Sequence, residues 1–153
     1  MAIVSHSGDS LVWLSIMVVI SLWQEGYWRD WALTMIVAML AVGLVVKLMK
    51  MIWRSERPEG DWGGIYRRTD PYSFPSGHAA RAGLLLTMAI ALGPVFLAVF
   101  LVAWAPLVCY SRVFMRLHVP FEVVCGFFLG VLSGLVINLV SGSGVIDFRD
   151  LFS

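Results

Sequence analysis

The chain has 153 residues, of which 59% are hydrophobic and 14% charged, and its formal net charge is +1. A soluble domain carries about a quarter charged residues, so this composition excludes an ordinary soluble domain and indicates an integral membrane protein with one domain, residues 1–153. The near-neutral charge leaves no basic face that could neutralise phosphate backbones, so we expect no nucleic-acid partner.

Apolar runs predict the helices. Each membrane crossing takes ~20 residues, and the chain is therefore expected to be all-α, a bundle of about five transmembrane helices. The runs, in chain order, are Leu11–Trp23, Trp31–Met49, Ala79–Leu92, Val95–Tyr110 and Val123–Val140. The first run has 13 residues, so it either borrows flanking residues or is re-entrant. No basic region or cleavage site precedes it, so a removable signal peptide is not expected. Cys109 and Cys125 lie in or beside apolar runs and are predicted to be buried thiols.

The first polar stretch ends the Trp31–Met49 run. Lys47, Lys50, Arg54 and Arg57 are spaced by 3, 4 and 3 residues and share one helical face. A cation deep in the membrane costs ~2.5–3.5 kcal/mol. Lys47 and Arg54 are expected to reach for lipid headgroups. Lys50 and Arg57 are predicted to bind an anion, because the proline after Arg57 turns the chain there.

The second stretch, Pro75-Ser76-Gly77-His78, leads into the next apolar run. Ser76 is a predicted N-cap, and the free N–H groups that follow it favour an anion site. Gly77 lets an oxyanion approach the backbone closely. His78 is either part of this site or a hydrogen-bonded interfacial histidine. Arg81 lies one turn further on the same face.

The third stretch holds Arg112, His118 and Glu122. His118 and Glu122 are four residues apart, which suits a carboxylate that holds one imidazole nitrogen and leaves the other free. The alternative is a structural ion pair. An even number of predicted crossings separates the second and third stretches, so all three polar stretches are expected on one side of the membrane.

Together these residues resemble the type 2 phosphatidic acid phosphatase superfamily, the lipid phosphate phosphatases and their haloperoxidase relatives. The resemblance covers residues 47–126 and rests on three motifs in order: Lys50-x6-Arg57-Pro58, Pro75-Ser76-Gly77-His78, and Ser111-Arg112-x5-His118. Glu122 departs from it, because the family usually has Asp there. Any one motif is weak, but three with correct internal spacing are highly specific.

The resemblance implies a phosphatase that uses no metal or other cofactor and works through a phosphohistidine. By that carry-over His118 attacks phosphorus, Glu122 orients His118, and His78 protonates the leaving oxygen. The phosphate oxygens would be held by Lys50, Arg57, Ser76, Gly77 and Arg112. Three cations would replace the metal ions of other phosphatases, since phosphoryl transfer depends on positioning and charge neutralisation.

The expected partners are membrane lipids and a lipid phosphate substrate: phosphatidic acid, phosphatidylglycerol phosphate or an isoprenyl diphosphate. The oligomeric state stays open. Nine of the eleven Lys and Arg residues lie on the motif side, which by the positive-inside rule indicates the cytoplasm. Resemblance to the family instead favours a cell-membrane protein with an extracytoplasmic site, and we adopt that expectation.

Two other functions compete. The charged residues could line the pathway of a transporter or channel for an anionic phosphorylated solute. Alternatively His78, His118 and Glu122 could bind a metal ion, although three neighbouring cations oppose a divalent ion.

Overall fold

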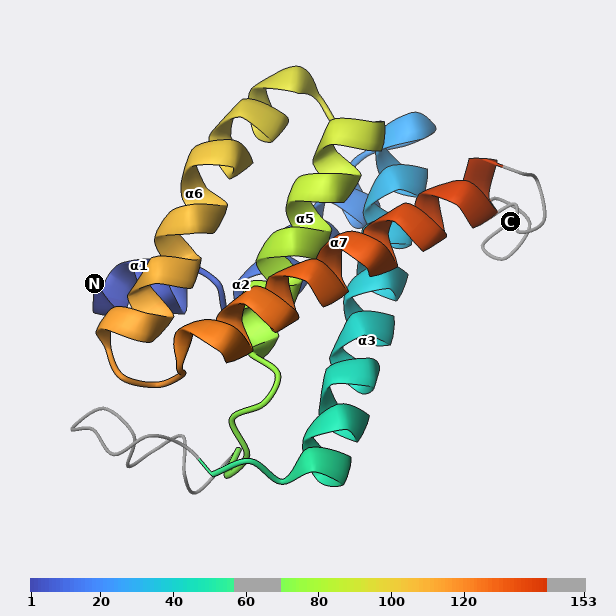
Figure 1. Cartoon of the computed structure of the whole chain (residues 1–153). Helices are drawn as coiled ribbons and strands as arrows, with labels where there is room; N and C mark the ends of the chain where they lie inside the picture. Colours follow the sequence, from blue (N-terminus) through green and yellow to red (C-terminus); the bar gives the residue numbers. More distant parts are fainter. Residues whose placement is uncertain (57–69, 143–153) are drawn as a thin grey trace.

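The computed structural model describes residues 1–56 and 70–142, and the regular structure in these ranges is helical apart from one isolated bridge between Glu56 and Tyr72. The helices are α1 (Ala2–His6), α2 (Ser10–Trp23), α3 (Tyr27–Trp53), α5 (Gly77–Leu92), α6 (Val95–Phe114) and α7 (Pro120–Gly142). Figure 1 shows α5 between α3 and α6, with α7 crossing it and α1 and α2 behind. The predicted all-α class is confirmed.

The five predicted apolar runs are all helices, and most extend beyond the predicted bounds. The helix α7 begins at Pro120, where a proline fits because the first helical N–H has no intrahelical acceptor. The helix α6 continues through Pro106. The short α1 was not predicted, because five residues are too few to show a helical period.

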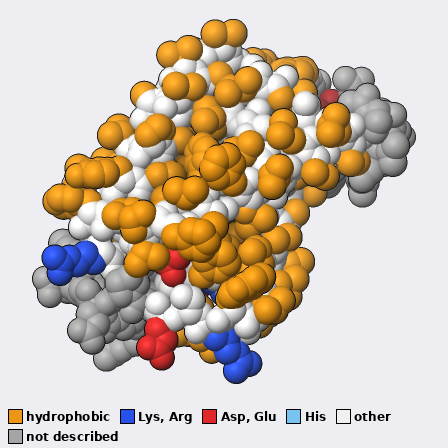
Figure 2. All heavy atoms as spheres, in the orientation of Figure 1, with side chains coloured by type: hydrophobic (Ala, Val, Ile, Leu, Met, Phe, Trp, Pro, Cys, Tyr) orange, Lys and Arg blue, Asp and Glu red, His pale blue; other side chains and the backbone are white. Residues whose placement is uncertain are grey.

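Within residues 1–56 and 70–142, three helices, α3, α6 and α7, are long and apolar enough to cross a membrane. Two shorter helices, α2 and α5, are apolar but have only 14 and 16 residues. At ~1.5 Å per residue they are shorter than the ~30 Å hydrocarbon core. Hydrophobic side chains cover most of the face in Figure 2, and most charged side chains in view gather near the end where α3 finishes. The chain is an integral membrane protein.

The tightest packing joins α5 to α7, through a row of glycines on α7. A Cβ added to Gly126 would lie 2.4 Å from the carbonyl oxygen of Ser76, and one added to Gly130 would lie 1.8 Å from that of Ala80. One turn on, a Cβ at Gly134 would lie 2.9 Å from Thr87 Cβ. Small residues let two membrane helices approach at backbone distance, so α7 fixes where the first turn of α5 lies.

A single buried core connects the helices. Its large members come from four helices: Trp13 and Met17 of α2, Trp31, Met35 and Met39 of α3, Leu84, Leu85 and Met88 of α5, and Leu101 and Trp104 of α6. The prediction of buried thiols needs correction, since Cys109 and Cys125 are free but only partly buried. Both sit on helices that present one side outward.

Candidate active site

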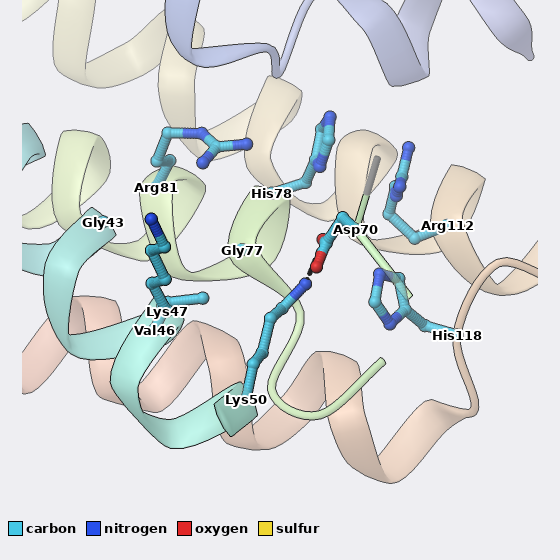
Figure 3. Close-up of a pocket in the computed structure, with 10 residues that line it drawn as sticks. All are labelled: Gly43, Val46, Lys47, Lys50, Asp70, Gly77, His78, Arg81, Arg112 and His118. Atoms are coloured by element: carbon cyan, nitrogen blue, oxygen red, sulfur yellow. Dashed lines mark hydrogen bonds and ion pairs between the residues drawn. The ribbon is translucent and has the colours of Figure 1, made fainter. Parts of the chain in front are cut away.

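A cavity of about 290 Å³ opens where α3 ends and α5 begins. Its described lining residues are Gly43, Val46, Lys47, Lys50, Asp70, Gly77, His78, Arg81, Arg112 and His118. In Figure 3, Lys47 and Arg81 lie toward one end, Arg112 and His118 toward the other, and His78 between them. The helix α3 contributes Lys47 and Lys50, α5 contributes Gly77, His78 and Arg81, and α6 contributes Arg112.

Five of the eight predicted site residues line this cavity, and they come from all three polar stretches: Lys50, Gly77, His78, Arg112 and His118. Glu122 is not among the described lining residues, but it contacts His118. Ser76 is not among the described lining residues, and Arg57 and Pro58 lie outside the described part of the chain. The structure therefore brings together residues up to 68 positions apart (50 to 118).

His118 and Glu122 form the pair that their spacing predicts. The Nδ1 of His118 lies 3.2 Å from Oε2 of Glu122, and both side chains are almost fully buried. The same oxygen accepts a hydrogen bond of 3.1 Å from the backbone N–H of Val119. One ring nitrogen is thus held by a carboxylate, which fixes the orientation of the His118 ring at the cavity.

The other oxygen of Glu122 is bound by two serines that sequence analysis did not select. Ser73 Oγ donates to Oε1 of Glu122, and Ser55 Oγ lies 3.3 Å from the same oxygen. The two serines are also joined by a 2.8 Å bond from the N–H of Ser73 to the carbonyl of Ser55. The position of Ser73, three residues before Ser76, was the one sequence signal that could have suggested it.

Arg112 and His118 are tied together by the turn after α6. Arg112 is 1% exposed, and its carbonyl accepts bonds of 3.1 Å from the N–H of Leu117 and 3.3 Å from that of His118. Arg116 has a left-handed backbone with φ of 53°, and this reverses the chain toward α7. The guanidinium and imidazole therefore reach one cavity from a single compact turn.

Lys50 forms an ion pair with Asp70, whose carboxylate lies between Lys50 and His118 in Figure 3. The lysine is buried, whereas the Asp70 side chain is 43% exposed. A phosphate bound at Lys50 would compete with this carboxylate. Asp70 was not among the predicted site residues. The neighbouring cation Arg81 donates from Nε to the carbonyl of Gly8 over 3.1 Å.

Asp9 is a further residue that sequence analysis missed. Its Oδ1 lies 2.7 Å from Nε2 of His78, and its Oδ2 lies 3.0 Å from Nδ1 of His6. The hydrogen bond to His78 lowers the pKa of Asp9 to about 2, so the group is a carboxylate at neutral pH. The only sequence signal was a lone acid before the first apolar run.

Ser76 behaves differently from the prediction. It occupies the N-cap position of α5, but its side chain makes no capping bond. Its Oγ is buried and finds no hydrogen-bond partner within residues 1–56 and 70–142. The backbone of Ser76 is instead packed on Gly126, and its N–H donates to the carbonyl of Glu122 over 3.1 Å. Contact with α7 thus decides the position of Ser76.

Lys47 also differs from the prediction. Its side chain was expected to reach for headgroups, yet it lines the cavity beside Arg81. Arg54 is exposed, and its Nε donates to the carbonyl of Met51 over 3.1 Å. Two cations, Lys47 and Arg81, therefore join Lys50 and Arg112 around the cavity.

The described residues do not support the metal alternative in its predicted form. No three His, Cys, Asp or Glu side chains of residues 1–56 and 70–142 cluster as metal ligands. His118 is held by Glu122, whereas His78 is held by Asp9. The two imidazoles thus belong to two separate carboxylate pairs.

Comparison with known proteins places the chain in a family. The model of the PAP2 superfamily matches residues 31–143. Undecaprenyl-diphosphatase of Sulfolobus acidocaldarius is 25% identical over 134 residues, which cover 85% of this chain and 64% of that protein. Lipid A 4'-phosphatase of Bacteroides thetaiotaomicron is 32% identical over 76 residues, 49% of this chain and 34% of that protein. The chain thus spans less than two thirds of the length of these curated relatives.

A solved structure shares the fold. The crystal structure of a transmembrane PAP2-type phosphatidylglycerolphosphate phosphatase from Bacillus subtilis aligns with a TM-score of 0.74 at 23% identity. The alignment covers 92% of this chain and 74% of that one. Because the family model matches well over half of the chain, the resemblance seen in the motifs is confirmed: the chain belongs to the PAP2 superfamily.

Proposed function

We propose that the protein hydrolyses the phosphate monoester or diphosphate headgroup of a membrane lipid without a metal ion, through a phosphohistidine on His118. The observation that carries this proposal is the pairing of His118 with Glu122 beside a cavity that also holds Lys50, His78 and Arg112. A phosphohistidine enzyme needs a histidine with one free nitrogen and fixed cations around the phosphoryl group.

The proposed reaction has two steps. Nε2 of His118 attacks phosphorus, the bond to the leaving oxygen breaks, and that oxygen takes a proton from His78. Glu122 stabilises the positive charge that develops on the His118 ring. In the second step water gives a proton to His78 while its oxygen attacks phosphorus, and the phosphorus–nitrogen bond breaks. Phosphate leaves and both histidines return to their initial states.

Cations and a backbone N–H group are proposed to neutralise the negative charge of the phosphoryl group. Lys50 and Arg112 neutralise the phosphoryl oxygens, and the backbone N–H of Gly77 adds a donor at the positive end of α5. Arg57, which follows the described end of this region, is proposed to complete the set. Ser76 is also kept as a proposed phosphate residue, although its hydroxyl would have to turn from its buried position toward the cavity.

The substrate is proposed to be a lipid because the cavity lies at the ends of apolar helices. Its phosphate would stay at the membrane interface while the tail stays in the bilayer. Lys47 and Arg81 add cations beyond those that one phosphate needs, which favours a diphosphate or similarly charged headgroup. The names of the relatives support this class, since one acts on undecaprenyl diphosphate and the other on lipid A. We propose that the site faces the extracytoplasmic side of the cell membrane.

The test is phosphate release by the purified protein in detergent, with EDTA present. The substrates are phosphatidic acid, phosphatidylglycerol phosphate, and an isoprenyl diphosphate with its monophosphate. We expect EDTA-resistant release that orthovanadate inhibits, and a higher kcat/KM for the diphosphate than for its monophosphate. His118→Ala should abolish release from every substrate.

Three outcomes would contradict the proposal. Absence of release from the whole panel would favour the transporter or channel. Loss of release with EDTA would favour a metal-dependent reaction. Full activity of the His118→Ala variant would exclude the phosphohistidine.

A further inference from the structure

The short stretch Ser5–Asp9, here called the N-terminal segment, contacts three residues of the cavity. Arg112 Nη1 donates to Ser5 Oγ over 2.6 Å, and Arg81 Nε donates to the carbonyl of Gly8. Asp9 holds Nε2 of His78 at 2.7 Å. Three cavity residues, two on α5 and one on α6, are thus each bound by this one segment, which lies outside all three sequence motifs.

The N-terminal segment is fixed in place by α2 and α6. Trp104 Nε1 donates to Ser7 Oγ, and Trp13 Nε1 donates to the carbonyl of Ser7, each over 2.9 Å. Gly8 lies so close that an added Cβ would sit 3.0 Å from Val108 Cγ1 and 3.1 Å from the ring of His78. These contacts therefore hold the segment that carries Asp9 in place beside His78.

The charges around His78 indicate what its contact with Asp9 does chemically. Burial of the ring, and the nearby charges of Arg112 and Arg81, oppose a positive charge on it. Asp9 supplies the opposing negative charge, as Glu122 does for His118. Since Nε2 of His78 is bound to Asp9, Nδ1 is the ring nitrogen left for a ligand.

Building on the proposed function, we propose that Asp9 is a positioning residue for His78, so that each of the two catalytic histidines has its own carboxylate. Asp9 orients the ring and stabilises its protonated form while Nδ1 gives its proton to the leaving oxygen. After the proton is transferred, neutral His78 stays hydrogen-bonded to Asp9 and accepts a proton from the attacking water. Asp9 itself gains and loses no proton in either step.

The test compares two leaving groups in the full-length protein. The leaving oxygen of an alkyl lipid phosphate needs a proton. A nitrophenyl phosphate monoester with an alkyl chain on its ring instead releases a nitrophenolate, which is stable without one. The kcat/KM value is used, because it reports the steps up to formation of the phosphoenzyme. Asp9→Asn should lower kcat/KM about 10²-fold or more on the alkyl ester and less than about threefold on the nitrophenyl ester.

Matched variants separate this role from a structural one. Asp9→Glu should recover most of the activity on the alkyl ester, since it keeps the carboxylate. Glu25→Gln removes an exposed carboxylate from the turn between α2 and α3 and should leave both substrates unchanged. In a His78→Ala background, Asp9→Asn should have no further effect, because the residue it acts through is gone.

Other outcomes would overturn the inference. An equal loss on both esters would show only that the N-terminal segment supports the fold. A gain of activity in Asp9→Asn would show that the carboxylate competes with the substrate for the cavity. Either result needs an active wild type, so failure of this inference is distinct from failure of the proposed function, in which wild type would hydrolyse neither ester.

Discussion

Glu122 shows how a single side chain can be held by the whole site. Its carboxylate contacts Ser55 and Ser73, which lie between α3 and α5, and His118 and Val119, which lie in the turn between α6 and α7. The family usually has the shorter Asp at this position, yet Glu still reaches His118 at 3.2 Å. Both carboxylate oxygens of Glu122 face hydrogen-bond donors, so a Gln side chain, whose NH₂ group is itself a donor, would not fit these contacts.

We therefore expect Glu122→Gln to lower kcat/KM for phosphate release by roughly 10²–10⁴-fold, the range for a misdirected catalytic histidine. The amide carries no charge to stabilise the imidazolium, and its NH₂ group would face a donor from which the carboxylate now accepts a hydrogen bond. Glu122→Asp keeps the charge and should lose less than about tenfold. Both values come from steady-state phosphate release in detergent, and equal activity of the two variants would exclude the proposed role of the carboxylate.

At the scale of elements, the contact between α5 and α7 positions the second motif. Gly126 touches the backbone of Ser76, so any displacement of α7 moves the start of α5, and with it Gly77 and His78. The same displacement would also move Glu122, which is in the first turn of α7. The glycine row thus keeps the two histidines in register, although no glycine in it reacts.

Gly130→Ala should destabilise the protein by about 1–3 kcal/mol, the usual cost of overpacking. Its new Cβ would start 1.8 Å from the carbonyl oxygen of Ala80, so the two helices would have to separate. Gly43→Ala is the matched control, because a Cβ there meets nothing within 4 Å and should improve helix propensity. Thermal unfolding in detergent measures both, and a Gly130→Ala midpoint at or above that of Gly43→Ala would contradict this packing.

At the scale of the whole molecule, charge is gathered at one end of an apolar bundle. Lys47, Lys50, Arg81 and Arg112 surround one cavity, while the core behind it is made of apolar side chains. Like charges held this close repel one another. A bound anion should therefore stabilise the folded protein as well as occupy its site.

We expect orthovanadate, or phosphate, to raise the thermal midpoint of the wild type, with a stabilisation of about 2.7 kcal/mol at 100 times its dissociation constant. EDTA should not change this effect. Arg112→Gln should remove most of it, because the guanidinium is buried at the cavity. Arg54→Gln, which removes an exposed cation, should keep it. Equal midpoint shifts in these two variants would show that the anion binds elsewhere.

The sequence by itself determined the apolar helices and the order of the three motifs. His118 lies in the turn before α7 and not on the helix, but it is only four positions from Glu122, and so short a separation keeps the two side chains within reach; the pair could therefore be predicted. The hydrophobic runs were likewise sufficient to predict the helices α2, α3, α5, α6 and α7, of which α3, α6 and α7 have the length that a membrane span requires.

Only the tertiary structure decided which distant residues complete these motifs. Asp9 meets His78 across 69 positions, and Ser73 meets Glu122 across 49. Neither contact has a local period, since each depends on how α1, α5 and α7 pack. In the folded chain Ser76 packs on Gly126 and is not among the described lining residues of the cavity, whereas Lys47 is. The His118–Glu122 contact follows from a short separation along the chain, whereas the Asp9–His78 and Ser73–Glu122 contacts follow from how distant segments pack.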